Sequence, residues 1–367
     1  MLRSILLTAA ACAVPVAAQT PPVPAMQAPA FDPATARAAV SDLANEIEEN
    51  FVFPDVAKRY AAMLRTKLAA GGYDNFPSRV AFAEAVTADL QAVFPDGHLA
   101  MHPSTGPRPE PRKAGDTALL APVKMPPLME QAGMIAPGIA YVRFNAFMGT
   151  PEVLRDFTAF LDANAGAKTL IIDARTHRGG GLDEMDVLFP RIFAKPATVM
   201  VMDTRASVAK KHGGLPFKSL TVVPAPAELF RAEHRVTPAS PASPWTKAKV
   251  YLLTSGRTAS AAEHLSSVLK STRRATLVGE TTAGAGNYGG GLELPGGYGA
   301  FIPFGHSYFP GEKGWEGVGV TPDIAVAPER ALYEVLTREG IAPAQAQALS
   351  DSHKPSVPMT RRRPLRS

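Results

Sequence analysis

The chain has 367 residues, of which 46% are hydrophobic and 19% charged, and its formal charge at pH 7 is +5. This length suffices for two domains with a substantial core. Arg3 and the five basic residues of 354–367 supply more than this positive charge, so the rest of the chain is nearly neutral. We find no stripe of basic and aromatic residues, and nucleic-acid binding is therefore not expected.

Residues 1–18 have the pattern of a secretory signal peptide. Arg3 precedes an apolar, alanine-rich run that is too short to cross a bilayer, and the small residues Val16-Ala17-Ala18 form a cleavage site. We expect cleavage after Ala18 and a periplasmic or secreted protein without an integral membrane segment. A lipoprotein signal at Cys12 is a weaker alternative. Cys12 is the only cysteine, so the mature chain would have neither a disulfide nor a cysteine metal site.

A small N-terminal helical domain is predicted over residues 32–103, after a linker at 19–31 that is rich in proline and alanine. Its three helical patterns begin at Asp32-Pro33, at Phe53-Pro54 and at Ser78. The domain ends in the turn-type sequence FPDGH (94–98) and a short segment after it. The proline-rich stretch 104–137 is expected to be an irregular linker.

Strands and helices alternate from residue 138 to about 350, which predicts an α/β fold with a largely parallel sheet. An insertion at about 205–248 is either a lid over a site or a surface excursion. The basic residues 351–367 are expected to form a disordered tail. The expected strands are 138–144, 169–173, 198–202, 250–254 and 275–278, and the expected helices are 152–163, 182–193 and 258–269.

The segment TSGRTASAAE (254–263) places a serine where a turn leads from a buried strand into a helix. A hydroxyl at Ser260 meets free N–H groups and the positive end of the helix dipole, which stabilise a developing anion. The N–H of Ala261 is a candidate oxyanion donor. Ser260 and Glu263 also form a capping box, which needs no catalysis. This segment alone favours a structural role over a catalytic one.

The segment IIDARTHRGGG (171–181) runs from a buried strand into three glycines. Consecutive glycines allow backbone N–H groups to point into a cavity without obstruction by side chains. Gly179 and Gly180 are therefore candidate oxyanion donors, although a plain tight turn explains the glycines equally well. A phosphate-binding loop is not expected, because no G-K-[ST] follows.

His98 lies in a turn at the junction of the two predicted domains, where catalytic residues are commonly placed. A lone histidine is usually incidental. His102 lies four residues further on, but Pro103 and the turn context argue against a helical metal pair, and the motif H-E-x-x-H is absent. No metal or other cofactor is expected. The nucleophile elbow of α/β-hydrolases is absent too, since GHSYF (305–309) lacks its last glycine.

Four segments together resemble the tail-specific and C-terminal processing serine peptidases. TSGRTASAAE resembles their nucleophile segment and IIDARTHRGGG their oxyanion loop, while VGETTAGAG (278–286) and EGVGVTPDIAV (316–326) resemble two later signatures. The order and spacing of all four agree. The resemblance implies an α/β catalytic core of the ClpP/crotonase-like fold, preceded by the small helical domain.

Two departures from the tail-specific pattern indicate a different branch. The stretch 104–137 is too short for a PDZ domain, and Ala285 stands where those enzymes use a lysine as base, which excludes a Ser–Lys mechanism. The chain instead resembles the tricorn core and interphotoreceptor retinoid-binding protein. In that branch a histidine is the base and a glutamate supports it, and the matching residues are His98 and Glu316, with Ser260 as nucleophile.

This resemblance implies an exported serine peptidase that cleaves polypeptides or peptides through an acyl-enzyme. Two alternatives stay open: a non-catalytic binding protein for an apolar ligand on the same scaffold, and an esterase that uses the same residues. Retention of Ser260, His98 and Glu316 together favours the peptidase.

Overall fold

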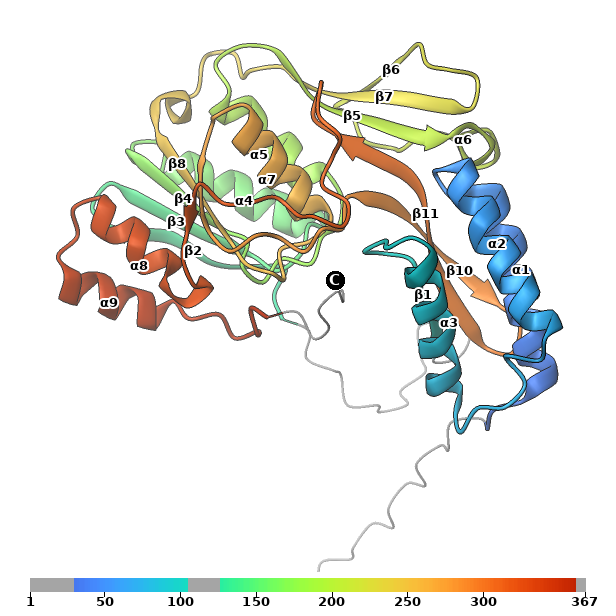
Figure 1. Ribbon diagram of the computed structural model, residues 1–367. Helices are drawn as coiled ribbons and strands as arrows, with labels where there is room; N and C mark the ends of the chain where they lie inside the picture. Colours follow the sequence, from blue (N-terminus) through green and yellow to red (C-terminus); the bar gives the residue numbers. More distant parts are fainter. Residues whose placement is uncertain (1–29, 105–125, 361–367) are drawn as a thin grey trace, which may run out of the picture. The chain divides into compact units, whose positions relative to one another are not determined.

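The computed structural model describes residues 30–104 and 126–360, which fall in one compact unit apart from Ala30 (Figure 1). Two six-stranded sheets form the framework of this part of the chain. The expected mixed α/β fold with a helical N-terminal region is confirmed. Among the described residues, no helix combines the length and apolar character needed to cross a membrane.

The N-terminal helical region contains α1 (Pro33–Asn50), α2 (Pro54–Ala69) and α3 (Arg79–Val93). Proline occupies the first position of α1 and α2, where its missing N–H costs nothing. The Ser78 hydroxyl accepts a hydrogen bond from the N–H of Ala81 at 3.1 Å and so caps α3. The predicted starts of all three helices are therefore confirmed.

This helical region packs onto one of the two sheets, the sheet that contains β11, rather than standing apart from it. The apolar faces of α1, α2 and α3 share a core with Tyr298, Ala300 and Ile302 of β11 (Tyr298–Tyr308). Strand β1 (Ala100–Pro103), which follows α3, pairs antiparallel with β11. The turn that carries His98 is thereby held between α3 and a strand of the sheet.

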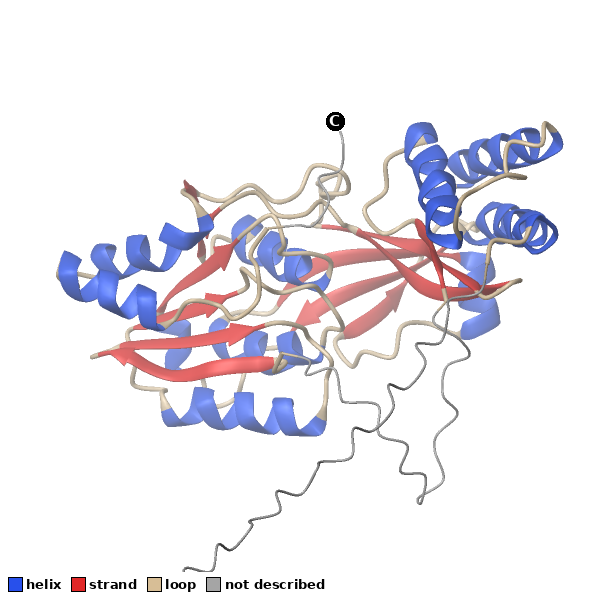
Figure 2. Cartoon of the chain, turned by 90° about the horizontal axis from the view of Figure 1, so that it is seen from below, coloured by secondary structure: helices blue, strands red, loops and turns tan. Residues whose placement is uncertain are grey.

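The first sheet is mainly parallel and has helices on both faces (Figure 2). Side chains alternate between the two faces of a strand. Val142 and Ile172 therefore share a core with α4, α5 and α7, whereas Tyr141 and Ile171 share one with α8 and α9. In the sheet, β2 pairs antiparallel with β3, and the strand order is β12 (Ile324–Ala325), β9 (Thr276–Gly279), β8 (Lys249–Thr254), β4 (Thr169–Asp173), β3 (Ile139–Phe144) and β2 (Met129–Ala136). The helices are α4 (Pro151–Ala163), α5 (Asp183–Ile192), α7 (Ala261–Ser271), α8 (Pro328–Arg338) and α9 (Pro343–Ser352).

The second sheet is antiparallel and was not foreseen from the sequence. Its order is β1-β11-β5-β7-β6, and β10 also pairs with β11. The predicted strand at 198–202 exists, but it belongs to this sheet. The strands not yet delimited are β5 (Ala197–Arg205), β6 (Leu220–Val223), β7 (Leu229–Val236) and β10 (Asn287–Leu294).

Three expectations about segments need correction. Strand β2 occupies 129–136, so that part of 104–137 is not an irregular linker. The insertion at 205–248 is not a plain surface excursion, because α6 (Ala206–His212), β6, β7 and η1 (Pro244–Lys247) continue the fold and β7 pairs with β5. Helix α9 reaches Ser352, and the carbonyl of Met359 accepts a hydrogen bond from Ser255, so residues 351–360 are not a disordered tail. Residues 361–367 of that tail lie outside the described residues.

Candidate active site

Ser260 stands at the N-cap of α7, directly after the turn that leads from β8. Its backbone has φ 57° and ψ −120°, a conformation with positive φ that a residue with a Cβ rarely adopts. The turn is fixed on both sides: Thr258 donates its hydroxyl to the carbonyl of Ala174, and the N–H of Ala259 donates to the carbonyl of His177. The strain is thus held by bonds to the neighbouring glycine loop, as expected where a side chain must be presented for function.

Glu263 connects the Ser260 backbone to the loop 282–285. Its Oε2 accepts the N–H of Ser260 at 2.9 Å and that of Ala285 at 2.8 Å, and its Oε1 accepts the Thr282 hydroxyl and the N–H of Gly284, both at 2.6 Å. Burial raises the pKa of Glu263, and these four hydrogen bonds oppose the rise. The capping-box glutamate is present as the sequence indicated, and it also orders the opposite wall of the site.

The glycine loop lies against Ser260 because it has no side chains. A Cβ on Gly179 would lie 2.6 Å from the Cβ of Ser260, and one on Gly180 would lie 1.7 Å from the carbonyl oxygen of Phe147. Both glycines also have positive φ, 113° and 133°. Any other residue would therefore displace the loop from Ser260 at position 179 and from the backbone of Phe147 at position 180.

The three expected oxyanion donors differ in their hydrogen bonds. The N–H of Gly179 donates to Nδ1 of His177 at 3.0 Å, so this donor is already engaged in the structure. Burial and the nearby Arg178 lower the pKa of His177 to about 3, which keeps the ring neutral and able to accept. Within the described residues, the N–H groups of Gly180 and Ala261 donate no backbone hydrogen bond.

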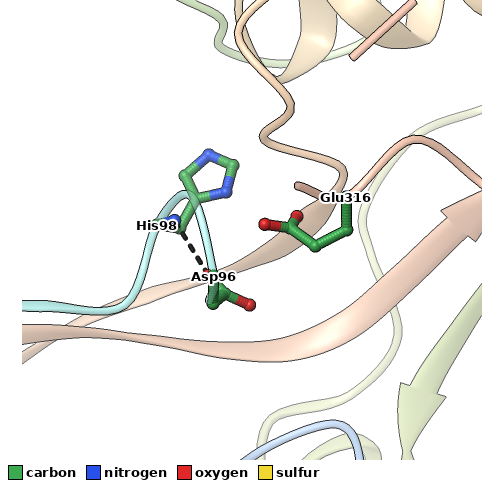
Figure 3. A group of neighbouring side chains, drawn as sticks. All are labelled: Asp96, His98 and Glu316. Carbon is green, nitrogen blue, oxygen red and sulfur yellow. Dashed lines mark hydrogen bonds between the residues drawn. The ribbon is translucent and has the colours of Figure 1, made fainter. Parts of the chain in front are cut away.

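His98 and Glu316 do meet, together with Asp96 (Figure 3). A ring nitrogen of His98 and one carboxylate oxygen each of Asp96 and Glu316 all lie within 4.8 Å of one another. Asp96 fixes the turn, because its Oδ1 accepts the N–H groups of His98 at 2.8 Å and of Leu99 at 2.9 Å. The His98 ring stacks on Phe301, with ring centroids 5.2 Å apart. These contacts hold the imidazole beside the carboxylate of Glu316.

Glu316 also accepts hydrogen bonds from both sides of the junction. Its Oε1 accepts the N–H of Gly97 at 2.5 Å, and its Oε2 accepts those of Gly286 at 2.6 Å and Asn287 at 2.7 Å. Burial and the charge of Asp96 raise the pKa of Glu316 to about 8, against the effect of the three N–H groups. A positive charge on the His98 ring would favour the ionised form of this carboxyl group.

A cavity of about 200 Å³ opens beside Ser260. Ser260, Ala261 and Gly180 line it, and so does Gly286, which is hydrogen-bonded to Glu316. His98 itself is not among the lining residues. The insertion at 205–248 contributes Leu215 and Phe217 to the wall. The structure thus places Ser260 and two N–H groups at one cavity, with the His98–Glu316 pair joined to its wall through Gly286.

Sequence reasoning missed Asp96 beside His98, and His264 and Trp315 in the cavity wall. Asp96 was seen only as part of a turn, and the sequence D-G-H is the signal that would have suggested its contact with the His98 backbone. His264 lines the cavity one helical turn after Ser260, a spacing visible in the sequence. Trp315 lines it from the loop just before Glu316, and no motif indicated that position.

A nucleophile candidate at a strained helix start, beside a glycine loop in an α/β core, is typical of serine hydrolases. The model of peptidase family S41 matches residues 138–326, and the model of the N-terminal domain of peptidase family S41 in eukaryotic IRBP matches residues 33–136. Together they cover most of the chain. The chain belongs to peptidase family S41, whose members are serine-type peptidases.

A solved structure supports this fold. The chain is similar to a putative peptidase from Parabacteroides merdae, with 19% sequence identity, a TM-score of 0.53 and coverage of 89% of this chain and 100% of that chain. It is also similar to a photosystem II D1 C-terminal processing protease, with 14% identity, a TM-score of 0.48 and coverage of 80% and 94%. The tricorn protease matches at 17% identity and a TM-score of 0.31, over 59% of this chain and 18% of that chain.

Proposed function

We propose that the protein is an exported peptidase in which Ser260 is the nucleophile, His98 the general base and Glu316 the residue that orients His98. The observation that carries this proposal is the strained Ser260 at the start of α7, beside a cavity and next to two N–H groups that have no backbone partner in the described part of the chain. Membership of family S41 supports peptide substrates.

The chemistry follows from these positions. His98 takes the proton of the Ser260 hydroxyl as the oxygen attacks a peptide carbonyl, and later returns it to the leaving amine. The N–H groups of Gly180 and Ala261 stabilise the negative oxygen of the tetrahedral intermediate. Water then hydrolyses the acyl-enzyme, with His98 again as base. The mechanism requires His98 to come within hydrogen-bond reach of Ser260 when substrate is bound, since catalytic contacts often tighten only then.

Labelling with a fluorophosphonate tests this proposal directly, because such reagents form a covalent bond only with an activated serine. We expect stoichiometric labelling of the wild-type protein, and peptide mapping should place the adduct on Ser260. Labelling at another serine would move the nucleophile. A protein that never labels but binds apolar molecules would instead be a binding protein on this scaffold, and one that labels but cleaves only small esters would be an esterase.

Export is the second part of the proposal. We expect the mature protein to begin at Gln19, because Val16-Ala17-Ala18 is the best processing site in a segment that lies outside the described residues. Intact-mass analysis of the periplasmic fraction checks this expectation. Recovery of full-length protein from the cytoplasm alone would contradict it, and cleavage immediately before Cys12 would favour the lipoprotein alternative.

A further inference from the structure

Two buried imidazoles and a partly exposed carboxylate form a row behind the cavity beside Ser260. His264, on α7, lines this cavity, and its Nε2 lies 3.0 Å from Nδ1 of His234 on β7. On the far side of the row, Nε2 of His234 lies 3.6 Å from Oδ1 of Asp186 on α5. Both rings are almost fully buried, with 3% of His264 and 1% of His234 exposed. The proposed mechanism uses none of the three residues.

The row fixes which ring nitrogen carries a proton. One hydrogen lies between the two facing nitrogens of His264 and His234. The negative charge of Asp186 favours the tautomer of His234 that carries its proton on Nε2. Nδ1 of His234 is then the acceptor, and Nε2 of His264 is the donor. Burial and the neighbouring His234 hold the pKa of His264 well below its usual value, so its ring is neutral at pH 7. The remaining nitrogen of His264, Nδ1, is therefore a hydrogen-bond acceptor.

The rest of the cavity wall combines apolar side chains with polar groups, which include Asn287, Ser307 and the indole of Trp315. The indole of Trp315 lies 6.5 Å from the His264 ring, centroid to centroid, and its buried N–H has no hydrogen-bond partner among the described residues. An uncompensated buried donor is costly, which points to a ligand that supplies an acceptor. The apolar and aromatic side chains of the wall belong to Leu182, Met202, Leu215, Phe217 and Tyr288.

A substrate carbonyl attacked by Ser260 brings its own side chain to this cavity, because Ser260, Gly180 and Ala261 line it. The groups that line the wall then indicate the properties of this substrate side chain. It has an aromatic or apolar body and an uncharged end that both donates and accepts a hydrogen bond. Tyrosine meets these requirements, whereas phenylalanine leaves the acceptor of His264 and the donor of Trp315 unpaired.

We propose that this cavity selects tyrosine at the residue whose carbonyl is attacked, with the phenolic hydroxyl donating to Nδ1 of His264 and accepting from the indole of Trp315. His264 is then a specificity-determining residue, and Asp186 acts on specificity through His234. This inference rests on the proposed function, because it takes the cavity beside Ser260 to be the substrate site.

Binding to the Ser260→Ala protein tests the inference without a need for turnover. Two product-like peptides that differ only in a C-terminal tyrosine or phenylalanine are titrated calorimetrically. We expect the tyrosine peptide to bind about tenfold more tightly, the value of one or two well-made hydrogen bonds. In the same background, Asp186→Asn should reduce the difference to less than about threefold, because both tautomers of the row become accessible, while the affinity for the phenylalanine peptide stays unchanged.

A matched control is Glu233→Gln, which removes a carboxylate adjacent in sequence to His234 but outside the row. This variant should keep the full preference for tyrosine. His264→Leu should abolish the preference, and Asp186→Asn provides the same information if the leucine variant does not fold. Equal affinity for the two peptides, no binding of either, or a preference that survives Asp186→Asn would overturn the inference.

Fluorophosphonate labelling of the wild-type protein separates this inference from the proposed function. Labelling of Ser260 without a tyrosine preference overturns the inference and leaves the peptidase proposal standing. A tyrosine preference that depends on Asp186, in a protein that does not label, supports the selectivity of the cavity and contradicts the proposed catalysis.

Discussion

Ser260→Gly is expected to abolish peptide hydrolysis and fluorophosphonate labelling while the melting temperature stays within about 2 °C of wild type. A nucleophile supplies the covalent step, so its loss should lower kcat by a factor on the order of 10⁴ or more. Glycine is nearly as good an N-cap as serine, and it adopts the positive φ of this position without strain. Three measurements on the same preparations check this prediction. Thermal unfolding gives the melting temperature, a peptide-cleavage assay gives kcat, and fluorophosphonate labelling reports the nucleophile.

The comparison with other serine variants sharpens this test. Ser260→Ala keeps a Cβ at a φ of 57° and should melt below the glycine variant, although both are inactive. Ser266→Ala removes another buried hydroxyl of α7, which donates to the carbonyl of Ala262, and should still label and cleave. A Ser260→Gly protein that melts normally and labels at a different serine would defeat the assignment of the nucleophile.

His98→Ala is expected to lower kcat by several orders of magnitude, on the order of 10³ to 10⁴, with the fold intact. An unassisted serine hydroxyl is a poor nucleophile, and the positive charge that forms on His98 is stabilised by the carboxylate of Glu316 beside it. Steady-state kinetics measure the loss. Near-normal hydrolysis would mean that another residue is the base.

His306 and His264 are the candidates that such a result would favour. Nδ1 of His306 donates a hydrogen bond to Oδ1 of Asn287 at 2.7 Å, and His264 lines the cavity. His102 provides the control, since it lies on β1 after the turn and His102→Ala should leave kcat unchanged. Ala285→Lys should not rescue His98→Ala, because the Ala285 side chain is buried and packs close to Gly97, which limits the room for a longer side chain.

The alternating part of the fold was predictable because its signals are local. Buried runs such as TLIID (169–173) and a hydroxyl cap at Ser78 determine an element from its own residues. The antiparallel sheet was not predictable in this way. Gly289, Gly290 and Gly291 interrupt the pattern of β10, and what makes this segment a strand is its pairing with β11. Strand β2 is likewise fixed by pairing with β3.

The candidate site likewise combines parts that are recognisable in a short segment with parts that depend on distant residues. Ser260 and the glycine loop are each recognisable in a short segment, and the sequence placed both at the ends of buried strands. His98 and Glu316 are far apart in the chain but close together in the fold. Only the resemblance to known peptidases suggested that they lie near each other. The pair His264 and His234 had no such precedent, because one residue lies on a helix and the other on a strand of the second sheet.

The separation of His98 from the cavity wall has an evolutionary consequence. Substitutions in the turn 96–98 remove the proposed base without altering a residue that lines the cavity beside Ser260. Selection on the proposed base and selection on what the cavity holds therefore act on different residues of this chain. A descendant can lose catalysis through a change at His98 and keep its ligand preference, so that an enzyme becomes a binding protein by few mutational steps.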